Sequence, residues 1–210
     1  MNRIIVFALM LFCMTMQIEA QTLSEEEVTA KMYQAFELNK AGKKAEALEL
    51  FLIVGENTKQ QRNEGERQVY VCSQTMACQC YELLGRYQEG YLLGKSLLQG
   101  KLNDEERKDV GHLYAMNGYM YACEFIQRDE KGRADYKRGR ELISEILPYS
   151  DGQVKEYAET KIPLSWYLEG ADYFVMQKFE EALKAYEKAL AGFQELGREK
   201  DVVSTMKWIA

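Results

Sequence analysis

The sequence predicts an all-α fold, and three features of its composition point to that class. Alanine, leucine, glutamate and lysine are abundant, and all four favour helices. Only two prolines, Pro148 and Pro163, occur in 210 residues. The dipeptides Asn-Gly and Asp-Gly, which are typical of β-hairpin turns, are nearly absent. Helices therefore have to supply the core.

The first twenty residues have the layout of a secretory signal peptide. Arg3 precedes the uncharged segment 4–16, and the small residue Ala20 stands before a polar, acidic run. Segment 4–16 is shorter than the roughly 20 apolar residues that a membrane span requires, which favours a cleaved signal over a permanent anchor. We expect a signal peptide at 1–20, cleavage after Ala20, and a mature chain that is exported and periplasmic or envelope-associated.

Charge and hydropathy narrow the partners of the mature chain. Removal of residues 1–20 takes away one basic and one acidic side chain, so the net charge of −6 does not change. An acidic surface repels phosphate backbones, and we expect no binding of DNA or RNA. No later stretch is long and apolar enough to span a membrane. The expected partner is a protein or a peptide.

The cysteines indicate helix packing more than chemistry. A lipoprotein signal ending at Cys13 is an alternative to cleavage after Ala20, and the bulky Phe12 before it disfavours that alternative. Two positions apart on a helix, Cys78 and Cys80 point in different directions and do not bridge. No Cys-x2-Cys metal motif occurs, so we predict no metal site. The mature chain keeps Cys72, Cys78, Cys80 and Cys123, which we expect to be buried, with their redox state left open.

The clearest repeated unit lies near the C-terminus. Small and aromatic residues follow one another three apart at Gly170 and Tyr173, and a second stripe continues through Ala182 and Tyr186. The spacing predicts two amphipathic helices joined at Gln177-Lys178. A small residue lets the two helices approach closely while the rings fill the space beside it.

This unit resembles the tetratricopeptide repeat, whose pattern is W-x2-L-G-x2-Y followed by A-x3-F in the second helix. The matching residues are Trp166, Gly170, Tyr173, Ala182 and Tyr186. The sequence departs from the pattern in having Glu169 at the leucine position and no closing proline. The resemblance implies a right-handed superhelical solenoid of helix pairs that resemble this repeat.

The small-x2-large signature recurs upstream at intervals of about 40 residues. It appears as Ala35-x2-Leu38, Cys78-x2-Tyr81 and Gly118-x2-Tyr121. We expect a repeat domain over 21–210, with units at about 25–61, 66–103, 105–150 and 155–197 and a partial fifth at 198–210. The third unit carries an insert around 129–135 that lengthens its first helix or its loop. These long periods resemble the arrays of bacterial signalling proteins, such as regions beside histidine kinases or maltose-activator-like regulators.

The fifth unit is incomplete, because Ala210 takes the small-residue position and no second helix follows it. The apolar segment 202–210 is unlike a polar cap. We therefore expect the natural protein to continue beyond Ala210, and this segment to fray or self-associate in isolation.

No pattern of catalytic residues is visible, and we expect neither an enzyme nor a cofactor. The only histidine is His112, which we interpret as a packing or capping residue at a helix start. No G-x-S-x-G or phosphate-binding glycine loop occurs. The basic stretch from Arg128 to Arg140 is interleaved with acidic residues and is interpreted as a solvated loop and not as a docking patch.

Stacked helix pairs of this type leave a concave face along the first helices, and such arrays use it to hold peptides. Helical phase places seven residues there: Met32, Phe36, Thr75, Gln79, Tyr119, Tyr167 and Phe174. Exposed rings suit peptide binding. The alternative is that these rings pack between neighbouring helices. Repeats that grip chaperone carboxyl termini present lysines and asparagines on this face, and Met32 and Phe36 disfavour that function here.

The sequence thus predicts a non-catalytic interaction module outside the cytoplasm. The favoured role is the sensory or docking segment of a bacterial envelope signalling protein. The alternative is a self-standing periplasmic scaffold for envelope assembly or secretion.

Overall fold

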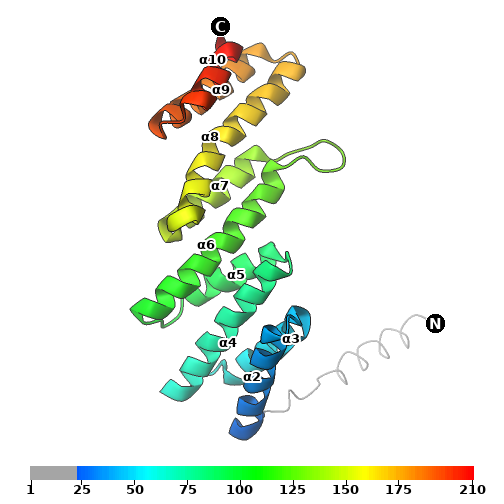
Figure 1. Ribbon diagram of the computed structural model, residues 1–210, viewed down its shortest axis with the longest axis vertical. Helices are drawn as coiled ribbons and strands as arrows, with labels where there is room; N and C mark the ends of the chain where they lie inside the picture. The colour runs from blue at the N-terminus through cyan, green and yellow to red at the C-terminus, as the bar shows by residue number, and fades with distance from the viewer. Residues whose placement is uncertain (1–22) are drawn as a thin grey trace, which may run out of the picture.

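The computed structural model describes residues 23–210, so the predicted signal peptide and its cleavage site lie outside the described residues. The described part is all-helical, which confirms the predicted all-α class (Figure 1). Its elements are α2 (Glu25–Lys40), α3 (Lys44–Thr58), α4 (Glu64–Leu83), α5 (Tyr87–Leu98), α6 (Asp104–Ile126), α7 (Tyr136–Ile146), the 3-10 turn η1 (Leu147–Tyr149), α8 (Gly152–Val175), α9 (Phe179–Glu195) and α10 (Glu199–Ile209).

Each helix packs against the next one along the chain, and the pairs follow one another along the long axis of the molecule (Figure 1). We call α2, α4, α6 and α8 the first helices, and α3, α5, α7 and α9 the second helices. Among the first helices, α4 also packs against α6, and α6 against α8. The first helices α4, α6 and α8 therefore lie side by side, and one surface crosses three helix pairs.

The turn between the two helices is alike in three of the four pairs. A backbone N–H beyond the first helix donates to a carbonyl five residues earlier, at 2.9 Å each time: Lys43 to Leu38, Arg86 to Tyr81 and Lys178 to Tyr173. The residue before each donor has a positive φ, +80° at Gly42, +70° at Gly85 and +61° at Gln177. This is the Schellman arrangement that ends helices. At Gln177 the chain adopts it without a glycine.

Small residues set the distance between packed helices. An added Cβ at Gly170 would lie 3.0 Å from the ring of Tyr186, and one at Gly118 would lie 2.5 Å from Ile146. Tyr186 and Ile146 are almost fully buried. The glycines therefore admit large side chains that fill the core beside them.

The two helices of the third pair, α6 and α7, are separated by the loop 127–135. This loop contains the expected insert and projects from the other helices (Figure 1). The Asp129 carboxylate folds this loop by accepting N–H bonds from Lys131 and Arg133 at 2.9 and 2.8 Å. The solvated-loop interpretation is wrong for Arg140, which lies in α7 and is only 9% exposed. Its guanidinium packs over the Trp166 ring, so a helix and not a loop positions it.

The prediction that the four cysteines are buried in helix packing is right for three of them. Cys78, Cys80 and Cys123 are buried as predicted, whereas Cys72 is exposed because α4 turns that position outward. None of these four forms a disulfide. Between residues 23 and 210, no helix is both long and apolar enough to cross a membrane.

Substitution of Gly90 tests the close approach of α5 to α6. An added Cβ would lie 2.2 Å from Asn117 Oδ1, and Asn117 is fully buried with its amide bonded to the carbonyl of Leu113 at 2.9 Å. We expect Gly90→Ala to lower the free energy of unfolding by about 1–3 kcal/mol despite alanine's better helix propensity. Urea unfolding measures the change.

Gly111→Ala is the matched control, because its added Cβ meets the Tyr149 ring only at an ordinary 3.5 Å. We expect that variant to be as stable as the parent or slightly more stable. Equal stability of the Gly90 and Gly111 variants would contradict the packing argument.

Candidate functional site on the first helices

A hollow of about 320 Å³ opens where α4, α6 and the start of α8 meet. Two of the residues predicted for the binding face, Thr75 and Gln79, line it. The Thr75 hydroxyl donates to the carbonyl of Val71 at 2.7 Å and keeps its lone pairs available, while Gln79 is exposed. The remaining lining residues are Met76, Lys108, Asp109, His112, Leu113 and Asp151.

The single histidine belongs to this hollow. His112 lies in the interior of α6, eight residues after its start, so its interpretation as a packing or capping residue at a helix start is wrong. Its ring is about half exposed, and Nδ1 lies 2.9 Å from Oδ1 of Asp151. Asp151 precedes α8 without capping it. The contact joins α6 to α8 across the boundary between the third and fourth pairs.

An aromatic pair lies on the same two helices. The half-buried ring of Tyr119 on α6 stacks with Tyr157 on α8, with centroids 6.2 Å apart and planes 27° from parallel. Lys161 places its ammonium 6.0 Å from the Tyr119 centroid. Burial raises the pKa of Tyr119, so its hydroxyl remains a neutral donor. Tyr157 is 52% exposed and leaves one side of the pair open.

The other predicted residues lie towards the two ends of the array. Met32 is half-buried against the core of the first pair, and Phe36, 37% exposed, meets Phe51 edge-on at 5.4 Å. Tyr167 is half-buried, with its ring 5.6 Å from that of Tyr186. Phe174 is exposed on one side and meets Phe179 and Trp208.

The rings are thus partly packed and partly open, a state between the two alternatives that the sequence left. The structure brings Thr75 and Gln79 together, and Tyr119 joins α6 to α8, but it does not gather all seven residues into one pocket. Sequence reasoning missed Tyr157 and Lys161. They lie in the part of α8 that precedes the repeat motif beginning at Trp166, where the motif has no position to assign.

The electrostatics of the hollow are mixed. Lys108 and Asp109 place opposite charges side by side on α6. Burial raises the pKa of the nearby Glu82 carboxyl, and the charge of His112 partly opposes that effect. In residues 23–210, no three histidine, cysteine or carboxylate side chains are placed to hold a metal ion. The groups present suit hydrogen bonding and ring stacking with a bound chain.

Comparison with known proteins finds no family model that matches the chain and no curated protein that resembles it. The tetratricopeptide resemblance therefore stays a prediction from the motif.

An ion pair joins the first turn of α4 to the first turn of α6. Arg67 donates to both carboxylate oxygens of Glu106, at 2.8 and 3.0 Å, and both side chains are largely buried. Glu106 also closes the capping box of α6 by accepting the N–H of Asn103 at 2.9 Å. Hydrogen bonding to Arg67 lowers the pKa of Glu106. The geometry is bidentate, which favours a defined register between the two helices.

Glu106→Gln isolates this charge, because glutamine retains the capping geometry. A carboxyl group whose pKa is lower in the folded state than its unfolded value of about 4.3 stabilises the fold above that pH. This stabilisation is lost as the pH falls through the folded-state pKa. We expect the parent to exceed the variant in unfolding free energy at pH 7, and the difference to vanish at strongly acidic pH. Urea unfolding across this range measures it, and a difference independent of pH would contradict the ion-pair account.

Proposed function

We propose that the chain is a non-catalytic, exported interaction module of the tetratricopeptide type, and that it binds a protein or peptide along its first helices. Its helix pairs form a right-handed superhelical solenoid, with the first helices on the concave side. The module is the sensory or docking segment of a bacterial envelope signalling protein. The observation that carries the proposal is that α4, α6 and α8 lie side by side, with the Thr75 hollow where α4, α6 and the start of α8 meet and the Tyr119–Tyr157 pair further along α6 and α8.

The half-packed rings support binding on energetic grounds. Each ring is held on one side by a neighbour, so little side-chain entropy remains to be lost when a partner covers the other side. Tyr157 offers such an open side on α8, and Gln79 offers an exposed amide on α4, with α6 between the two helices. A partner that crosses α4, α6 and α8 meets both groups.

A random-peptide display library selected on the protein tests this surface. We expect selected peptides to lose at least about ten-fold in affinity on Tyr157→Ala and on Gln79→Ala, because hot-spot contacts exceed 1.4 kcal/mol. Leu92→Ala on the second helix α5 is the control, since Leu92 is equally exposed at 52%. Affinity is measured by titration of a labelled selected peptide.

Two results would count against the surface. Selected peptides that respond to Leu92→Ala and not to Tyr157→Ala would place binding elsewhere. A stability loss of about 3 kcal/mol or more on Tyr157→Ala would make that ring part of the core.

Export is tested separately by the chemistry of the N-terminus. We expect protein recovered from the envelope fraction of a producing bacterium to begin at Gln21, because Ala20 provides the small residue that signal peptidases require. N-terminal sequencing measures it. Retention of Met1, or an acylated Cys13, would contradict cleavage after Ala20.

A further inference from the structure

Exposed large apolar side chains gather at the end of the fourth pair. Three rings meet there: Phe174 at the end of α8 contacts Phe179 at the start of α9, with centroids 5.6 Å apart, and Trp208 near the end of α10, at 5.4 Å. Aliphatic side chains adjoin the rings along the chain. We call the following six residues, which are 40–79% exposed, the terminal patch: Phe174, Val175, Met176, Phe179, Leu183 and Trp208.

The size of the terminal patch matches the apolar part of a stable protein interface. Such an interface buries about 800 Å² on each partner. About 55–65% of that area is apolar, so each partner has to supply about 500 Å² of apolar surface. The three rings are about half exposed and offer about 300 Å², since a fully buried ring covers about 150–250 Å². The aliphatic side chains add about 150 Å².

The charges beside the terminal patch allow two copies to approach each other. The chain has a net charge of −6, so two copies repel one another over most of their surface. Both signs of charge flank the patch in sequence, on exposed side chains that form no ion pair among the described residues: Lys178, Glu180, Glu181, Lys184 and Lys207. Opposite charges of two copies can therefore meet at the rim of a shared contact.

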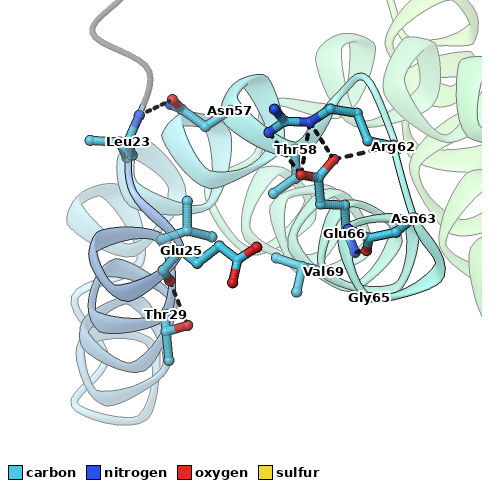
Figure 2. Close-up of a pocket in the computed structure, with 11 residues that line it drawn as sticks. Leu23, Glu25, Thr29, Asn57, Thr58, Arg62, Asn63, Gly65, Glu66 and Val69 are labelled. Atoms are coloured by element: carbon cyan, nitrogen blue, oxygen red, sulfur yellow. Dashed lines mark hydrogen bonds and ion pairs between the residues drawn. The ribbon is translucent and has the colours of Figure 1, made fainter.

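The opposite end of the array does not complement the terminal patch. The first pair exposes three large apolar side chains, Tyr33, Phe36 and Ile53, of which only Tyr33 is more than half exposed. The hollow between α2, α3 and α4 is lined mainly by polar groups, and its Arg62 guanidinium already pairs with the Glu66 carboxylate at 2.8 Å (Figure 2). A head-to-tail contact would place the patch against this polar surface. Contact between two copies of the patch is therefore favoured, and such a contact is two-fold.

We propose that the terminal patch is the interface of a two-fold homodimer. The rings of Phe174 and Trp208 lie at its centre and are withdrawn from water, and the lysines and glutamates beside the patch form its rim. The three rings are already held against one another in the single chain, so the contact costs little side-chain entropy.

The dimer leaves the proposed peptide surface open. Of the residues predicted for the binding face, the terminal patch includes only Phe174, whereas the Thr75 hollow and the Tyr119–Tyr157 pair lie outside it. One particle then carries two peptide surfaces, and a partner with two binding segments gains avidity. Dimerisation is measured without any peptide, so failure of either proposal leaves the other in place.

Sedimentation velocity of the purified protein over a wide range of concentration tests the dimer. We expect a monomer at low concentration and a dimer at high concentration. Val175→Glu should weaken the dimer at least about ten-fold, because it puts an unpaired charge into an apolar contact. Phe179→Ala should weaken it by a similar factor, since rings within an interface carry much of its affinity.

Leu83→Glu is the matched control. Leu83 ends α4 as Val175 ends α8, both are exposed, and the same kind of turn follows each of them. The same change therefore has the same local effect on the helix end, but only Val175 belongs to the terminal patch. We expect Leu83→Glu to leave the dimer as strong as that of the parent. The melting temperature of each variant at low concentration shows that it folds.

Three results would overturn the proposal. The first is a protein that stays monomeric at every concentration, and the second is a dimer that withstands both Val175→Glu and Phe179→Ala. The third is growth beyond the dimer into longer assemblies, which would show a head-to-tail contact. If the monomer instead floats with vesicles of phosphatidylethanolamine and phosphatidylglycerol and Val175→Glu abolishes this, the terminal patch binds a lipid surface and not a second copy.

Discussion

The close approach of neighbouring helices at small residues is the constraint on which the rest of the structure depends. At Gly170 and Gly118 a helix comes so near its partner that a single added carbon would collide with Tyr186 or Ile146. Close approach lets large side chains interlock instead of merely touching, and dense packing supplies most of the stabilisation of such a core. Without these contacts each amphipathic helix would lack a surface on which to bury its apolar stripe.

The same constraint explains why rings on the first helices are half open. A first helix uses one face for its own second helix and another for the neighbouring first helix, so rings between those faces are covered on one side only. Tyr119 meets Tyr157 in this way, and Phe36 meets Phe51. The surface consequently combines half-open rings with polar side chains such as Gln79 and Lys161, and this combination follows from packing geometry.

The fold class could be predicted from the sequence because the features that carry it are local. The spacing of small and aromatic residues shows which face of each helix carries small side chains and which carries large ones. The residues are Gly170, Tyr173, Ala182 and Tyr186. The site was harder to predict. Helical phase gives the direction of Thr75 and Gln79, but only the packing of α6 beside α4 brings His112 to them.

Contacts between pairs also involve polar side chains that the motif does not specify. Arg140 shows this most clearly, because its guanidinium lies 3.4 Å from the Trp166 centroid while it donates to Glu169 at 2.7 Å and to Ser165 at 3.2 Å. Glu169 occupies the position where the motif has leucine, and the structure gives a physical reason for this difference from the motif. It neutralises a buried arginine from the preceding pair, which would otherwise be costly to bury.

Two ion pairs join the second helix pair to the third in the same manner: Arg67 with Glu106, and Lys95 with Glu145. Both contacts depend on two residues far apart in sequence, and neither residue belongs to the small-x2-large signature. The motif therefore determines how a pair closes on itself, whereas ion pairs and aromatic contacts act together with close approaches such as that of Gly90 to Asn117 where one pair packs on the next. Since the candidate surface at His112 and Tyr157 crosses such a boundary, its shape depends on the contacts that the motif leaves unspecified.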